Sequence, residues 1–193
     1  MNKIKTIGRR IFVKPVVRVL VMLNVPPMVI TMFSLILAIS AFLFYWRGLF
    51  LIGALFLILC GLFDTFDGEV ARQTDRVTKI GGFLDSTIDR INEFIIYFGL
   101  FLYYHTHAPH ATPWVFLALF GSMMVSYTRA RGEGLGISPQ IGLFERFIRI
   151  VFICIGSVLG PTGMVYVLVI LTIGTLHTMI HRIIFMRTKS KQS

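Results

Sequence analysis

Acidic residues are scarce in this chain, and they are not spread evenly along it. The sequence has nine Asp and Glu residues against nineteen Lys and Arg residues, and seven of the nine lie between Asp64 and Glu93. Cysteine is also rare, because only Cys60 and Cys154 are present. Both lie in apolar runs, where cysteine behaves as a small buried hydrophobe, so the sequence gives no indication of a disulfide.

Polar residues are too few for a soluble domain of 193 residues, since 55% of the chain is hydrophobic and the mean hydropathy is +0.78. No compact apolar segment with a small-residue cleavage site follows the basic N-terminus, so we expect no signal peptide. The net charge of +10 is compatible with nucleic acid binding. In a membrane protein, however, basic residues mark the cytoplasmic side, and we expect no nucleic acid partner.

Six apolar stretches approach the ~20 residues that a helix needs to cross the hydrocarbon core of a bilayer. The sequence therefore predicts an all-α integral membrane protein with six transmembrane helices. Their expected ranges are 29–46, 49–63, 81–104, 113–127, 143–159 and 161–181.

The whole chain, 1–193, is expected to form one membrane domain, because its length is typical of a single domain. Residues 1–27 mix basic and apolar side chains, which is typical of an amphipathic juxtamembrane helix on an anionic surface. Pro15 suits the first turn of that helix. The alternative is a solvated basic tail. The six-helix bundle is expected over 28–182 and a basic tail over 183–193.

Charge asymmetry predicts the orientation of the bundle. If both termini are cytoplasmic, every Lys and Arg except Arg47 lies on the cytoplasmic side, and so do all the acidic residues. The outward loops 105–112 and 160–163 then carry no formal charge. We therefore expect a multi-pass protein of a prokaryotic cell membrane, with every charged group able to do chemistry on the cytoplasmic side.

Four aspartates form two pairs at helical spacing. Asp64 and Asp67 are three residues apart, and Asp85 and Asp89 are four apart, so each pair shares one helix face. Carboxylates close to hydrocarbon are costly, which favours a functional role. Four ionised carboxylates aimed into one space repel one another unless cations lie between them. A hard, oxygen-liganded cation such as Mg²⁺ or Mn²⁺ is the expected occupant.

The stretch from 64 to 89 follows the pattern D-x-x-D-G-x-x-A-R, eight residues, G, three residues, D, three residues, D. It thereby resembles the signature of the CDP-alcohol phosphotransferase family. The matching positions are Asp64, Asp67, Gly68, Ala71, Arg72, Gly81, Asp85 and Asp89.

The resemblance implies an enzyme that uses a CDP-linked donor, usually CDP-diacylglycerol. An acceptor hydroxyl attacks the lipid-side phosphorus, and CMP leaves. Two metal ions, Mg²⁺ or Mn²⁺, can neutralise the pyrophosphate. Asp64, Asp67 and Asp85 are then metal ligands, and Asp89 is a ligand or the base that takes the acceptor's proton.

The resemblance also implies a surface for the CDP part of the donor. Gly68 and Ala71 are small, so a nucleotide can approach the helix backbone closely, and Arg72 can bridge phosphate oxygens. The expected donor-binding set is Asp64, Gly68, Ala71, Arg72 and Thr78.

Three arginines are candidates for binding a phosphorylated acceptor, namely Arg129, Arg131 and Arg146, because a guanidinium offers a fixed fork of donors. The segment 126–133 resembles the S-Y-x-[KR]-A-R-A-E stretch of family members that use inositol phosphate, with Gly132 in place of the second alanine. Inositol 1-phosphate is the favoured acceptor, and glycerol 3-phosphate is the alternative. Arginines placed only by membrane topology remain a third interpretation.

Two other classes of protein compete with an enzyme. A divalent-cation transporter could use intramembrane carboxylates, but a path needs polar groups through the midplane, and here they stop at the cytoplasmic half. A nonenzymatic membrane scaffold leaves the aspartate pattern unexplained. The resemblance implies a homodimer, with membrane lipid and the two substrates as the other partners.

Overall fold

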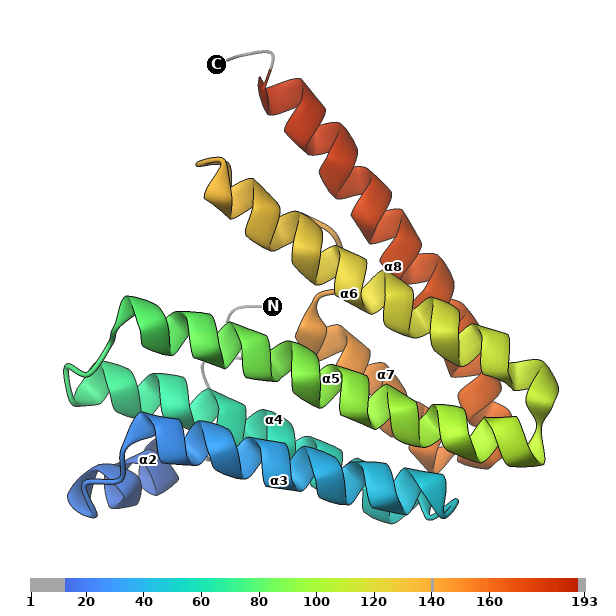
Figure 1. Cartoon of the computed structure of the whole chain (residues 1–193), viewed down its shortest axis with the longest axis horizontal. Coiled ribbons are helices and arrows are strands. Elements are labelled where there is room, and N and C mark those ends of the chain that lie inside the picture. The colour runs from blue at the N-terminus through green and yellow to red at the C-terminus, as the bar shows by residue number, and fades with distance from the viewer. Residues whose placement is uncertain (1–12, 140, 191–193) are drawn as a thin grey trace.

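The computed structural model describes residues 13–139 and 141–190, which form helices joined by short connections (Figure 1). Within these ranges there is no β-strand. The elements, in chain order, are α2 (Lys14–Met22), α3 (Pro27–Trp46), α4 (Phe50–Gln73), α5 (Lys79–His107), η2 (Pro109–Ala111), α6 (Thr112–Gly134), α7 (Arg146–Val158) and α8 (Gly160–Ser190).

Four helical stretches of the described chain are long and apolar enough to cross a membrane, namely Pro27–Trp46, Phe50–Gln73, Pro109–Gly134 and Gly160–Lys189. The all-α class and its membrane character are therefore confirmed, whereas the count of six crossings goes beyond this finding. The 29-residue helix α5 carries charged side chains in its first half. Helix α7 has 13 residues, which is about 20 Å of rise against a hydrocarbon core of about 30 Å.

Several helix ends differ from the sequence expectation. Helix α7 begins at Arg146 and not at residue 143, because Glu145 adopts an extended backbone conformation with ψ 164°. Helix α6 continues to Gly134, seven residues beyond the expected end of its span at residue 127. Helix α8 continues to Ser190 through most of the expected tail. Helix α4 runs unbroken past the expected end of its span at residue 63 and through the aspartate motif to Gln73.

At the N-terminal side, α2 begins with Pro15 in its first turn and packs on α4, where Val17 is buried with Phe66 and Val70. The first twelve residues of the expected juxtamembrane segment lie outside the described residues. Exposed apolar side chains lie along the rest of α2, among them Val16 and Val19.

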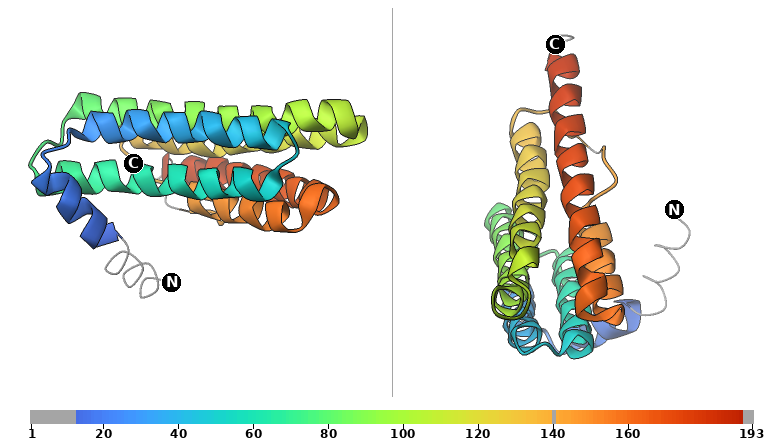
Figure 2. Two further views of the ribbon diagram at one scale, coloured as in Figure 1. Left: turned by 90° about the horizontal axis from the view of Figure 1, so that it is seen from below. Right: turned by 90° about the vertical axis from the view of Figure 1, so that its right-hand side faces the viewer.

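The bundle is closed at one end and open at the other. Helix α3 packs along α4 and α5, α6 packs along α8, and α7 lies between α4 and α8. Figure 1 shows α6 and α8 leaning away from α3, α4 and α5 toward the end where α5 begins, and Figure 2 shows the same divergence from another side. The first half of α5 therefore separates from the last half of α6.

Close packing holds the opposite end together. A Cβ atom at Gly99 of α5 would lie 2.7 Å from the backbone oxygen of Phe42 in α3. Such proximity lets the two helix backbones touch. Tyr45 is buried there and shares a hydrogen bond of 2.9 Å with Ser157 of α7. The main hydrophobic cluster occupies this end, so the polar groups described next gather at the open end.

Candidate active site

Three aspartates meet where α4 and α5 run side by side. Oxygen atoms of Asp64, Asp85 and Asp89 all lie within 4.8 Å of one another. Asp64 projects from the later part of α4, and the other two are one turn apart in the first half of α5, so they share a face. The short connection from α4 to α5 makes the helices antiparallel, which brings the two faces together.

Asp67, the fourth aspartate of the pattern, lies one turn after Asp64 on α4 and is buried. It stands outside the three-oxygen group and accepts a hydrogen bond of 2.6 Å from the hydroxyl of Thr31 in α3. Sequence reasoning did not identify Thr31. The available signal was weak, because Thr31 is one of three Ser and Thr residues in the apolar span of α3, with Ser34 and Ser40.

Arg146 connects the aspartates to the start of α7. Its Nη1 atom lies 2.7 Å from Oδ2 of Asp64 and forms a second, shorter ion pair with Oδ1 of Asp89. Arg90 contributes a further cation 3.6 Å from Asp89. The sequence placed Arg146 in an acceptor pocket, and the structure places its guanidinium against the acidic cluster.

The cluster has the chemistry of a divalent cation site. Oδ1 of Asp67 and Oδ1 of Asp85 are buried and receive no hydrogen bond within the described chain. A buried charged oxygen is unfavourable unless a donor or a cation compensates it. Asp85 has no ion pair among the salt bridges of the described residues, whereas Asp64 and Asp89 share Arg146. The residues present therefore fit a hard cation with oxygen ligands.

The expected donor-binding residues lie on the same stretch of α4. Gly68 and Arg72 follow Asp64 by one and two turns, so the three share a face. The Arg72 side chain is exposed, pairs with Glu69 at 2.9 Å, and lies 3.5 Å from where a Cβ of Gly68 would be. Ala71 is half-buried beside them.

Thr78 has a structural role in addition to any contact with a ligand. It is the N-cap of α5, and its Oγ1 atom accepts a hydrogen bond of 3.0 Å from the backbone N–H of Gly81. Capping of this kind satisfies one of the free N–H groups at a helix start. The cap fixes where α5 begins, and hence where Asp85 and Asp89 lie.

A cleft of about 660 Å³ opens beside the cluster, between the first half of α5, the last half of α6, and the nearby parts of α7 and α8. Arginines dominate its charged lining, which comprises Arg90, Arg129, Arg146, Arg149 and Arg182 together with Glu133 and Glu145. Arg129 pairs with Glu133 at 2.9 Å.

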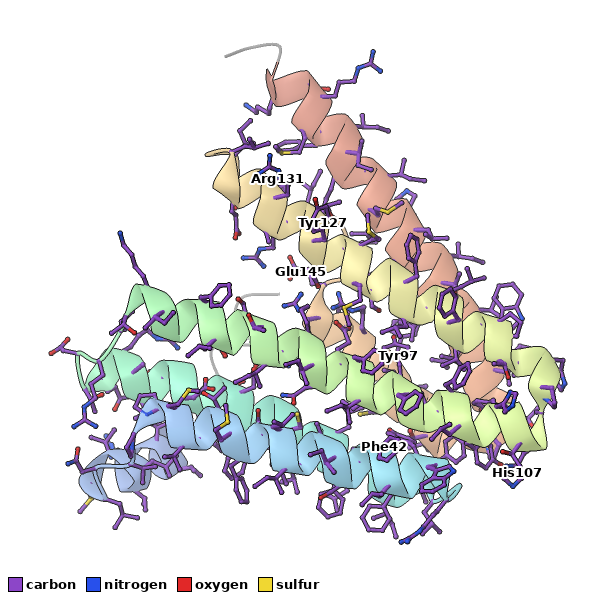
Figure 3. All side chains as sticks on the ribbon, in the orientation of Figure 1. Phe42, Tyr97, His107, Tyr127, Arg131 and Glu145 are labelled. Carbon is purple, nitrogen blue, oxygen red and sulfur yellow. The ribbon has the colours of Figure 1, made fainter. Side chains whose placement is uncertain are left out.

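The sequence grouped Arg131 with Arg129 and Arg146, and the structure separates it from them. Arg131 is exposed and is not among the residues that line the cleft. Figure 3 shows it beyond Tyr127, toward the free end of α6.

Two buried arginines were not predicted as site residues. Arg149 of α7 is paired with Glu93 of α5, and Arg182 of α8 donates to the backbone oxygens of Val125 and Ile141. The arginines are each 1% exposed. Charged residues inside the expected apolar helices were the signal that could have identified them.

Comparison with known proteins identifies the family. The family model described as CDP-alcohol phosphatidyltransferase matches residues 23–188. The archaetidylinositol phosphate synthase of Methanothermobacter thermautotrophicus is 35% identical over 99% of this chain and 96% of its own length. The chain belongs to the CDP-alcohol phosphatidyltransferase family. The enzyme class expected from the aspartate pattern is thereby confirmed.

Other members of the family agree with this assignment. The phosphatidylinositol phosphate synthase of Streptomyces avermitilis is 32% identical over 80% of this chain and 68% of its own length. Crystal structures of the phosphatidylinositol phosphate synthase of Mycobacterium tuberculosis share the fold at 24% identity. The one with CDP-DAG bound gives a TM-score of 0.84 and covers 91% of this chain and 93% of that one. The one with manganese and citrate gives 0.85 and covers 92% and 90%.

Proposed function

We propose that this enzyme transfers the phosphatidyl group of CDP-diacylglycerol to the hydroxyl of a phosphorylated polyol and releases CMP. One observation carries the proposal: Arg146 contacts the acidic cluster and also lines the arginine-rich cleft. A cation-binding centre suited to a pyrophosphate therefore adjoins a cleft suited to a second anion. Transfer between two phosphate-bearing substrates needs this juxtaposition.

The acidic side would bind the donor. Asp64, Asp67, Asp85 and Asp89 would hold Mg²⁺ or Mn²⁺, and we propose two ions. The ions would supply positive charge that neutralises the pyrophosphate and its leaving group. A related structure contains manganese. Asp89 contacts Arg146 and directly precedes Arg90, and both arginines line the cleft, so we assign Asp89 either a ligand's role or that of the base for the acceptor hydroxyl.

The remainder of the donor site would use the exposed face of α4. Arg72, whose own side chain is exposed, would exchange its partner Glu69 for a phosphate oxygen, since an ion pair with one partner in solvent contributes little to stability. Gly68 and Ala71 would let the nucleotide approach the helix. Thr78 would act through the start of α5 that it caps.

The basic side would bind the acceptor phosphate. Arg129 of α6 and Arg146 of α7 line the cleft, and we add Arg149 of α7, which lines it as well. Arg131 stays a proposal that would need movement of its exposed side chain. We favour inositol 1-phosphate over glycerol 3-phosphate because the names of the relatives share inositol phosphate and differ in the lipid.

We also propose how the helices cross the membrane. We propose six crossings, α3 to α8, with both termini in the cytoplasm of a prokaryotic cell and α2 on the membrane surface. Helix α7 can be short because it begins at Arg146, inside the cleft, and needs to cover only the remaining depth. We further propose one membrane domain over the whole chain and a homodimer, in which exposed apolar side chains face lipid or the second copy.

A CMP-release assay tests this function. Purified protein is incubated with CDP-diacylglycerol, Mg²⁺ or Mn²⁺, and one acceptor from a panel of inositol 1-phosphate, glycerol 3-phosphate and free inositol. We expect CMP only with metal and a phosphorylated acceptor, and fastest with inositol 1-phosphate. Faster release with glycerol 3-phosphate would identify a phosphatidylglycerophosphate synthase instead. No release with any acceptor, or full release in excess chelator, would refute the proposed reaction.

A further inference from the structure

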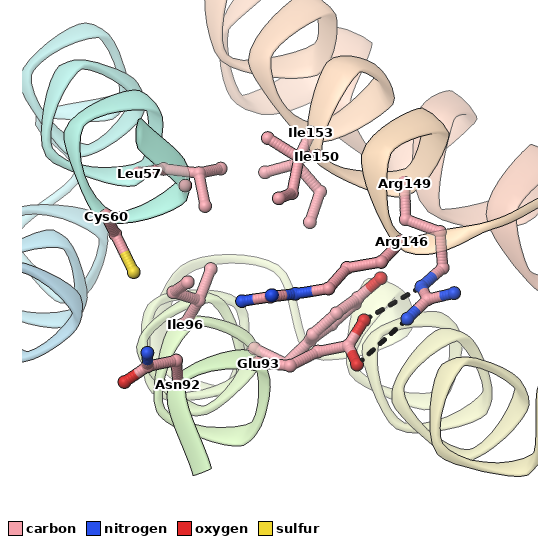
Figure 4. Close-up of a pocket in the computed structure, with 11 residues that line it drawn as sticks. Leu57, Cys60, Asn92, Glu93, Ile96, Arg146, Arg149, Ile150 and Ile153 are labelled. Atoms are coloured by element: carbon pink, nitrogen blue, oxygen red, sulfur yellow. Dashed lines mark hydrogen bonds and ion pairs between the residues drawn. The ribbon is translucent and has the colours of Figure 1, made fainter. Parts of the chain in front are cut away.

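A buried ion pair lies at the inner wall of the cleft. Glu93 of α5 is 8% exposed and Arg149 of α7 is 1% exposed. Nε of Arg149 donates to one carboxylate oxygen of Glu93 at 2.8 Å, and Nη2 donates to the other at 3.0 Å. Figure 4 shows the two parallel contacts, with Arg146 beside them. Such a bidentate pair fixes both the position and the plane of the guanidinium.

Two further contacts hold Arg149 in this orientation. Its Nη1 atom donates to the backbone oxygen of Phe144 at 3.0 Å, and Nη2 lies 3.4 Å from the hydroxyl of Ser126. A guanidinium has five N–H groups. Four contacts to α5, α6 and the segment before α7 therefore leave little freedom to turn.

The pair does more than neutralise charge in a buried place. Arg149 and Ser126 both line the cleft, whereas Glu93 lines a smaller pocket behind it, together with Arg146 and Arg149. Replacing a buried ion pair with apolar residues is often neutral or stabilising, so packing alone does not require charge here. A carboxylate behind an arginine that faces a cleft is the arrangement that orients a phosphate-binding group.

We propose that Glu93 is a positioning residue for the acceptor phosphate: it holds Arg149 so that the one guanidinium N–H group left free by the four contacts has a fixed direction in the cleft wall. This inference rests on the proposed function, because it needs a phosphorylated acceptor in the cleft. Glu93 acts through Arg149 and touches neither substrate. Preorganised donors bind an anion more tightly because no conformational freedom is lost on binding.

The proposal and simple electrostatics predict opposite results for Glu93→Gln. Removing the negative charge makes the cleft more positive, so attraction alone would lower the KM for an anionic acceptor. Glutamine, however, has one accepting oxygen, and its NH₂ group repels an arginine N–H. One of the two contacts is lost, and Arg149 turns. If orientation matters, the KM for the acceptor rises.

The test measures KM for inositol 1-phosphate and, separately, for CDP-diacylglycerol in wild type and Glu93→Gln. We expect the acceptor KM to rise roughly tenfold or more, as for one charge-assisted hydrogen bond, with the donor KM within about twofold. Tyr45→Phe is the matched control, because it removes a buried hydrogen bond at the closed end. It should lower the melting temperature in detergent without changing either KM.

A second variant guards against misfolding. Glu93→Asp keeps the charge but is one methylene shorter, so it cannot hold both contacts, and the acceptor KM should again rise while the donor KM does not. An unchanged or lower acceptor KM in either variant would overturn the inference. Equal increases in both KM values, or an increase in Tyr45→Phe, would also overturn it. Failure of the proposed function gives a different result: wild type itself would then release no CMP with any phosphorylated acceptor.

Discussion

The substitution Asp85→Asn tests whether the acidic cluster is a cation-binding site or only a structural group of charges. The substitution preserves the shape of the side chain and removes one charge. Around Asp85, the three carboxylates of Asp64, Asp67 and Asp89 face the two guanidinium groups of Arg90 and Arg146, so the group without Asp85 carries one excess negative charge. A further charge about 5 Å away is repelled by roughly 3 kcal/mol at an effective dielectric constant of about 20. In excess chelator, Asp85→Asn should therefore be more stable than wild type.

Added metal should reverse that order. A ligand that binds only the folded state stabilises it by about 2.7 kcal/mol at one hundred times its dissociation constant. Wild type should gain this stabilisation with Mg²⁺ or Mn²⁺, and Asp85→Asn should gain much less. For a chain of this size, 1 kcal/mol corresponds to roughly 2–4 °C of melting temperature. Activity of Asp85→Asn should fall by orders of magnitude.

The assay is a thermal melt in detergent with and without metal. Asp75→Asn is the matched control, since Asp75 is an exposed aspartate in the turn between α4 and α5. It loses the same charge and should respond to metal as wild type does. The reasoning is refuted if metal raises the melting temperature of Asp85→Asn as much as that of wild type. It also fails if chelated Asp85→Asn melts below chelated wild type.

Three further outcomes are expected. Arg129→Ala should raise the acceptor KM by roughly tenfold, and Arg131→Ala should raise it less because Arg131 lies off the cleft, as steady-state kinetics can show. A cysteine at Thr106 should react with an impermeant reagent added to intact cells; no labelling there would reverse the orientation. Gly99→Ala should lower stability by roughly 1–3 kcal/mol in a melt, because the added methyl group meets the backbone of Phe42.

The spacing of residues in the sequence was sufficient to predict the parts of the site whose residues lie close together in the sequence. Helical periodicity placed Asp85 and Asp89 on one face, and the structure brings both near Asp64 across a short connection. The unbroken run of α4 through the motif was also predictable, because no proline or glycine pair interrupts it before Gln73. Short-range geometry is fixed by the backbone period, so a sequence pattern is sufficient for it.

Long-range pairs were not predictable in the same way. Glu93 and Arg149 are 56 residues apart, and Thr31 and Asp67 are 36 apart. Each contact depends on which helices become neighbours and at what depth. Arg131 shows that proximity in the sequence can also mislead. Its closeness to Arg129 suggested a shared pocket, but a step of two residues along a helix rotates the side chain by about 200°, so the two arginines point in different directions.

The charges on the walls of the cleft disfavour closure of the open end of the bundle. The facing walls of α5, α6 and α8 carry Arg90, Arg129 and Arg182, and only Glu133 and Glu145 oppose them within the described cleft. Closing these walls would dehydrate like charges, which is costly without a partner. Among the described residues, the opposite end carries Arg47 as its one Lys or Arg, and it closes through Gly99. An anion in the cleft would supply the missing negative charge, which is why we propose that a phosphorylated acceptor binds there.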